Sequence, residues 1–127
     1  MRRLLVDTDV LVDFLRGLRT AVEFVQNNVN EIGVSVITIA ELYAGVREGD
    51  ERKTVDGFIN TLESISLTQQ IARQAGLYRR DFGKTHGTGL ADAIIAATSE
   101  LHEYTLVTLN KKHYPMLDEV LMPYQKR

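Results

Sequence analysis

Short apolar runs alternate along this chain with segments whose apolar residues recur every three or four positions. The runs end at polar residues, are rich in β-branched side chains and span only a few residues, which favours buried strands. They cover residues 4–6, 34–37, 64–67, 105–109 and, more weakly, 120–122. Strands that alternate with helical segments are typical of a parallel sheet covered by helices on both faces.

The segments between the runs have the periodicity of amphipathic helices. Four apolar stripes begin at Ile39, Val55, Ile71 and Leu90. Two pairs, Thr20 with Glu23 and Thr38 with Glu41, have the spacing of a capping box at a helix start. We therefore predict a single domain over residues 1–127, an α/β fold with three α/β/α layers and a mainly parallel sheet of four or five strands.

Composition narrows the functional classes. The absence of cysteine excludes a disulfide scaffold, a zinc ribbon and a thiol nucleophile. The net charge of -2 argues against a protein that holds nucleic acid through a large basic surface, but not against an enzyme that contacts it briefly. Charges interrupt every apolar stretch before the ~18 residues of a membrane span. We expect a cytoplasmic protein without a membrane partner.

Four polar residues are predicted to lie near one edge of the sheet. Asp7 follows the first strand and Asn110 follows the fourth, while Glu41 and Asp92 lie in the first turns of helices. In open sheets of this type, functional groups gather beyond the carboxyl ends of the strands. At 100° per residue, Glu41 and Asp92 point away from the apolar stripes of their helices, toward solvent or a shared polar cavity.

Each acid also has a simpler interpretation. Glu41 can complete a capping box with Thr38, and Asp92 can complement the positive end of its helix. Asp7 can be the N-cap of the following helix, a role for which Asp9 is a rival. Their combination at one edge favours a shared site.

Carboxylates held close together repel each other unless a cation compensates their charge. Hard oxygen ligands select Mg²⁺ or Mn²⁺, and the chain has neither cysteine nor paired histidines for zinc. The expected metal ligands are Asp7, Glu41 and Asp92. Such a metal can lower the pKa of a bound water and orient a phosphodiester.

Four segments carry a family resemblance: LLVDTDVLVDFLRG, SVITIAELYAGV, GLADAIIAAT and TLVTLNKKHYP. In this order they resemble the signature segments of PIN-domain ribonucleases, and more narrowly of VapC-type toxins of toxin–antitoxin pairs. The resemblance covers nearly the whole chain. It implies a Mg²⁺- or Mn²⁺-dependent endoribonuclease that acts on RNA, is usually a homodimer, and is inhibited by an antitoxin that inserts a segment into the active-site groove.

The resemblance also implies roles for single residues. Asp7, Glu41 and Asp92 match the first three acids of the family, whereas Asn110 stands where many members have a fourth acid. This departure argues against tight binding of a second metal, although Asn110 stays a candidate catalytic residue. Thr8 and Thr108 also match family positions and can hydrogen-bond acids or ligand waters.

Other polar residues were weaker candidates. Asp9 and Asp13 can support the site, but Asp13 is expected on a solvated helix face, and Tyr43 is expected to pack in the core. The histidines lack metal-ligand spacing, and His113 is at most a substrate contact. Two other functions remain open: an aspartate-nucleophile phosphatase, suggested by the strand followed by Asp7, and a non-catalytic binding module whose acids only cap helices.

Overall fold

Five parallel strands form the central sheet of the computed structural model, which describes residues 2–125. Along the sheet the strand order is β3-β2-β1-β4-β5. The strands are β1 (Leu4–Val6), β2 (Ile32–Ser35), β3 (Glu63–Ile65), β4 (Thr105–Val107) and β5 (Val120–Leu121). All five predicted strands are present, and every pairing is parallel, as the alternating pattern predicted.

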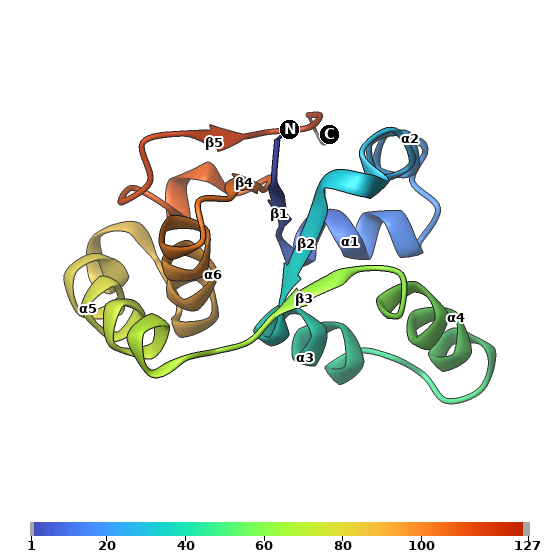
Figure 1. Cartoon of the computed structure of the whole chain (residues 1–127), viewed down its shortest axis with the longest axis horizontal. Coiled ribbons are helices and arrows are strands. Elements are labelled where there is room, and N and C mark those ends of the chain that lie inside the picture. The colour runs from blue at the N-terminus through green and yellow to red at the C-terminus, as the bar shows by residue number, and fades with distance from the viewer. Residues whose placement is uncertain (1, 126–127) are drawn as a thin grey trace.

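Helices cover both faces of this sheet (Figure 1). The α-helices are α1 (Thr8–Leu15), α2 (Arg19–Asn27), α3 (Val36–Ala44), α4 (Asp50–Ile59), α5 (Gln69–His86) and α6 (Leu90–Leu101). Two short 3-10 helices, η1 (Val29–Glu31) and η2 (Lys111–His113), complete the fold. In Figure 1, α5 and α6 lie on one side of the sheet and α1, α2 and α4 on the other, which confirms the three-layer prediction.

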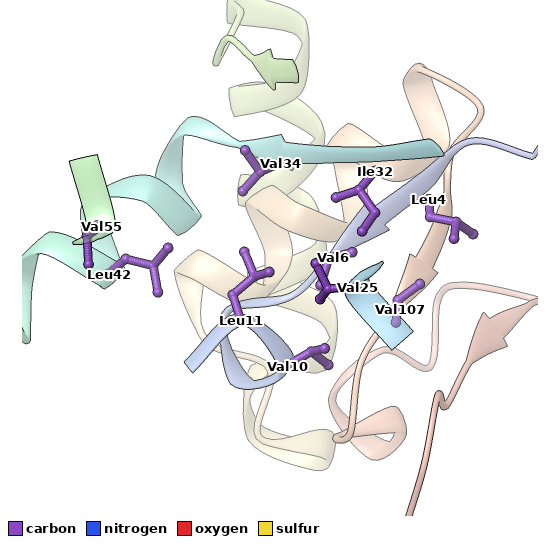
Figure 2. Packing of buried hydrophobic residues seen from close by; sticks show 10 residues of the cluster. All are labelled: Leu4, Val6, Val10, Leu11, Val25, Ile32, Val34, Leu42, Val55 and Val107. Carbon is purple, nitrogen blue, oxygen red and sulfur yellow. The ribbon is translucent and has the colours of Figure 1, made fainter. Parts of the chain in front are cut away.

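The strands distribute their side chains between two cores because successive residues point to opposite faces. Leu4 and Val6 pack with helices α1 and α2, in the cluster shown in Figure 2. Leu5, between them, packs on the opposite face with Leu106 and with Ile95 of α6. The central strands β1, β2 and β4 are buried on both sides, so they are mostly apolar without an alternating pattern, whereas the edge strand β3 exposes Glu63 and Ser64.

The boundary between β2 and α3 differs from the prediction. The run 34–37 was predicted as strand, but β2 ends at Ser35 and α3 begins at Val36. Ser35 is the N-cap, and its hydroxyl accepts a hydrogen bond of 3.2 Å from Ile37 N. Thr38 is therefore inside the helix and fully buried, and the predicted capping box between Thr38 and Glu41 is wrong.

The other predicted capping box, Thr20 with Glu23, is also wrong. Helix α2 has Leu18 at its N-cap position, without a side-chain cap, and Glu23 instead pairs with Arg19 one turn earlier, at 3.0 Å. Within residues 2–125, no helix is long and apolar enough to cross a bilayer.

The sheet reverses its order beside β1. The chain adds β2 and β3 on one side of β1 and then returns to place β4 on its other side. In sheets of this type the crevice for a ligand opens at the carboxyl ends of the strands where the order reverses. The residues that follow β1 and β4 therefore flank this position.

Candidate active site

Asp7 is the residue that follows β1, at the reversal point. It is the N-cap of α1, and its Oδ1 accepts a hydrogen bond of 2.8 Å from Thr8 N. Its Oδ2 accepts two further hydrogen bonds, from the Thr108 hydroxyl at 2.7 Å and from the Tyr114 hydroxyl at 2.8 Å. The capping role considered for Asp7 is confirmed, but it involves only one oxygen of the carboxylate.

The surroundings of Asp7 disfavour a negative charge. The side chain is only 6% exposed, and burial, followed by the nearby charge of Asp9, raises its pKa. Hydrogen bonds from Thr108, Tyr114 and Thr8 act in the opposite direction, and the resulting pKa is about 6. A cation beside Asp7 would relieve this unfavourable environment.

Asp92 approaches the same edge from the start of α6. Helix α6 begins after Gly89, and Asp92 Oδ2 accepts a hydrogen bond of 3.1 Å from Gly89 N. Its other oxygen, Oδ1, lies 3.2 Å from the Tyr114 hydroxyl, and His113 Nδ1 lies 3.5 Å from Oδ2. Asp92 thus stabilises its helix, as its simpler interpretation predicted, and also shares Tyr114 with Asp7.

Tyr114 also belongs to this site, although the sequence did not predict it as a site residue. The side chain is 1% exposed and its ring packs with Leu5 and Leu106 in the core, while its hydroxyl reaches the two acids. Burial and the charges of Asp7 and Asp92 raise the pKa of the phenol, so it stays protonated and can donate. The TLNKKHYP segment contains Tyr114, but the short η2 turn before it has no periodicity that would predict where the ring points.

Glu41 lies close to the first acid through Thr8. It is in the second turn of α3, later than predicted, and its side chain is exposed. The Thr8 hydroxyl donates a hydrogen bond of 2.6 Å to Glu41 Oε1. Since Thr8 directly follows Asp7, this bond ties Glu41 to the carboxyl end of β1.

Asp9 and Asn110 form the other flank of the site. Asp9 accepts hydrogen bonds from Val10 N at 2.7 Å and from Leu109 N at 3.0 Å, so it joins α1 to the end of β4. The exposed Asn110 places its side-chain Nδ2 at 3.4 Å from Asp9 Oδ2. The amide at position 110 thus faces a carboxylate, which a fourth acid there would repel.

Comparison with known proteins identifies the fold. A model of the PIN domain matches residues 4–116. The chain belongs to the PIN-domain family. This PIN domain is 35% identical over 124 residues to Ribonuclease VapC10 of Mycobacterium tuberculosis, a match that covers 95% of this chain and 92% of that protein. It is 36% identical over 124 residues to Ribonuclease VapC19 of the same species, covering 94% and 98%.

Solved structures show the same fold. A toxin–antitoxin complex from Klebsiella pneumoniae contains a chain that is 28% identical, with a TM-score of 0.83, covering 97% of this chain and 99% of that one. DNA-bound VapBC from Salmonella typhimurium matches with a TM-score of 0.77 at 23% identity, covering 95% and 96%, which supports the fold alone. The resemblance to VapC-type toxins inferred from the sequence motifs is confirmed.

The prediction for the surroundings of Asp13 is wrong. This residue was expected on a solvated helix face, but it is 3% exposed, and the Tyr124 hydroxyl donates a hydrogen bond of 2.9 Å to its Oδ2. The prediction failed because the C-terminal segment lies against α1, a long-range contact without a local sequence pattern. Tyr43, by contrast, packs against the core as expected.

Two carboxylates in this site suit a hard divalent cation. Asp7 and Asp92 supply oxygen ligands, and Mg²⁺ is usually held by one or two carboxylates while it keeps several waters. Among residues 2–125, no group of three or more His, Cys, Asp and Glu side chains is close enough to hold one metal ion. The donor set therefore fits a magnesium site built on Asp7 and Asp92, and the participation of Glu41 as a third ligand stays a prediction.

Proposed function

We propose that this PIN domain is a metal-dependent endoribonuclease, the toxin of a type II toxin–antitoxin pair that acts in the cytoplasm. The observation that carries the proposal is the pairing of Asp7 and Asp92 through the Tyr114 hydroxyl, at the reversal point of the sheet. The relatives that match over nearly the whole chain are named ribonucleases. These relatives favour a nuclease over the aspartate-nucleophile phosphatase and over the non-catalytic module.

Asp7 and Asp92 are the proposed ligands of Mg²⁺ or Mn²⁺, with Glu41 as a third group and Asn110 at the rim. When bound, the cation would lower the pKa of a water and offset charge on the phosphodiester. The buried and crowded position of Asp7 supports this assignment, because a carboxylate with a raised pKa gains from a nearby positive charge.

The chain's own residues prepare this site for RNA. Thr108 and Tyr114 fix one oxygen of Asp7, and Thr8 fixes Glu41 on the exposed side. Preorganised groups of this kind lower the barrier because they need no rearrangement during the reaction. The phosphate would approach from the side where Glu41 and Asn110 are exposed.

An antitoxin is the proposed protein partner, in a hetero-oligomer or beside a homodimer of this chain. A groove of about 470 Å³ adjoins Glu41 and continues along α1, α3 and α4. Its lining is partly apolar, with residues such as Val12 and Leu42, and partly charged, with two arginines and two glutamates: Arg16, Arg47, Glu41 and Glu51. The groove offers a place for the inhibitory segment that the family resemblance implies.

RNA cleavage by the purified chain tests the activity. We expect cleavage with Mg²⁺ or Mn²⁺, none with EDTA, and a fall of at least about a hundredfold in Asp7→Asn and in Asp92→Asn, consistent with the loss of a metal ligand. Asp118 is exposed, and Asp118→Asn is the matched control, which should keep wild-type cleavage. Undiminished cleavage in both site variants would mean that a contaminating nuclease or another site is responsible.

A further inference from the structure

Tyr114 has no role in the family resemblance, yet its hydroxyl is the group that Asp7 and Asp92 share. We propose that Tyr114 is a positioning residue, whose hydroxyl sets the separation and orientation of these two carboxylates for one divalent cation. The inference rests on the proposed metal-dependent function and adds to it a residue that touches both acids.

The position of the hydroxyl is fixed by packing of the ring. Tyr114 is 1% exposed, and its ring lies in a core cluster with Leu5, Ile95 and Leu106, from β1, α6 and β4. Side chains in such a core occupy single rotamers and move little. The hydroxyl is therefore a rigid reference point at the carboxyl edge of the sheet.

The backbone around Tyr114 is tied to the helix that carries Asp92. The Thr88 hydroxyl donates a hydrogen bond of 2.7 Å to His113 O, directly before Tyr114. Tyr114 N donates to Lys111 O at 3.0 Å, which closes the η2 turn. The segment after β4 thus reaches the start of α6, and Tyr114 extends this connection to Asp7 at the end of β1.

The hydrogen-bond pattern leaves both acids able to bind a cation. A phenol has one proton, so Tyr114 donates to one carboxylate at a time, and the shorter distance of 2.8 Å favours Asp7 Oδ2. Asp7 Oδ1 accepts from Thr8 N, and a carboxylate oxygen has room for a second partner. When the phenol donates to Asp7, Asp92 Oδ1, 3.2 Å from the phenol oxygen, receives no hydrogen bond from it and is available to a cation.

Metal binding to the full-length chain tests the inference without relying on activity. Isothermal titration with Mn²⁺ and with Mg²⁺ compares the wild type with Tyr114→Phe, which keeps the ring and removes only the hydroxyl. Loss of a residue that orients metal ligands typically weakens metal binding by about 10–100-fold. We expect a dissociation constant at least about tenfold higher in Tyr114→Phe.

Tyr104→Phe is the matched control. Tyr104 is also a buried tyrosine, 8% exposed, but its hydroxyl donates to Glu63 at the start of β3. Removing that hydroxyl should leave the affinity for Mn²⁺ within about twofold of the wild type. Equal or tighter Mn²⁺ binding by Tyr114→Phe would overturn the positioning role, whereas a wild type that binds neither metal would overturn the metal-dependent function itself.

A second measurement needs no variant. Because Tyr114 touches both proposed ligands, Mn²⁺ or Mg²⁺ should perturb the near-ultraviolet tyrosine absorption of the wild type with the midpoint found by titration. A saturated site without such a change would also contradict the inference. In RNA cleavage, Tyr114→Phe should need more metal for half-maximal rate while its KM for RNA is unchanged, a separation that a general loss of stability does not produce.

Discussion

The Thr8 hydroxyl donates a 2.6 Å hydrogen bond to Oε1 of Glu41, and this bond links the first turn of α1 to the second turn of α3. Glu41 is exposed, so without Thr8 its long side chain would sample several rotamers. Thr8→Val should therefore lower RNA cleavage about tenfold. Its melting temperature should change little, because an exposed hydrogen bond to a charged group contributes little to stability.

The initial rate of RNA cleavage at fixed Mn²⁺ measures this effect. Thr61→Val is the matched control, because the Thr61 hydroxyl bonds a carbonyl at the end of α4, outside the residues assigned to the site. Equal rates in the two variants would show that Glu41 does not need Thr8 to act.

Asp7 makes the metal-free chain less stable at neutral pH. The pKa of Asp7 is about 6 in the folded chain against 3.8 for an unperturbed aspartate, so between these pH values the folded state binds more protons than the unfolded state. The free energy of unfolding therefore falls as pH rises from about 4 to about 6. Asp7→Asn removes this penalty and should be more stable than the wild type by on the order of 2–3 kcal/mol at pH 7.

Urea unfolding in EDTA from about pH 3.5, just below the unperturbed pKa of 3.8, to about pH 8, well above the folded pKa of about 6, checks the sign. The advantage of Asp7→Asn should shrink toward zero as pH falls through the window. An advantage that is independent of pH would show that the carboxylate charge is not its cause.

Sequence patterns predicted those strands and helices that are determined mainly by residues close together in the chain. The mostly apolar runs before Asp7 and Asn110 form strands because both faces of the sheet are covered there, and the parallel order then places those residues at one edge. The strand prediction for residues 34–37 was wrong because Ser35 caps a helix that starts with four β-branched residues, at positions 36–39. In this case a single hydrogen bond to the backbone outweighed β propensity.

Two contacts between distant parts of the chain, both made by tyrosine hydroxyls, had no sequence signal. Tyr114 lies 107 residues from Asp7, and Tyr124 lies 111 residues from Asp13, yet both tyrosines donate to those acids. An aromatic residue in a segment without periodicity gives no indication of which carboxylate it will meet. The position of Asp7 at this edge and the hydroxyls of Thr8 and Thr108 were predicted from the sequence, whereas the two tyrosine hydroxyls were visible only in the structure.

Tyr124 should matter for stability and not for catalysis. Its hydroxyl donates a hydrogen bond of 2.9 Å to the buried Asp13. Removing a donor from a buried carboxylate lowers the free energy of unfolding by roughly 1–3 kcal/mol. Tyr124→Phe should lower the urea midpoint accordingly while RNA cleavage below that midpoint is unchanged. Tyr43→Phe, which loses an exposed bond to Asp56, is the control and should stay within about 0.5 kcal/mol of the wild type.

The variant Asn110→Asp should be less stable than the wild type. The side-chain Nδ2 of Asn110 lies 3.4 Å from Asp9 Oδ2, so Asn110→Asp places two carboxylates face to face. Because position 110 is exposed, the loss should be at most about 1 kcal/mol at low salt and should decrease as salt is added. The double variant Asp9→Asn with Asn110→Asp should recover most of it in urea unfolding; a loss that salt and the second substitution both leave unchanged would rule out charge repulsion.

Divalent metal should stabilise the folded chain through Asp7 and Asp92. A ligand that binds only the native state at ~100 times its dissociation constant adds about 2.7 kcal/mol to the free energy of unfolding. The melting temperature of the wild type should therefore rise with Mn²⁺, while Asp92→Asn, which keeps an oxygen that can accept from Gly89 N, should lose most of this rise. Asp118→Asn should behave as the wild type. The same rise in Asp92→Asn and in the wild type would place the metal elsewhere on the chain, because Asp92 is the only proposed ligand that this variant changes.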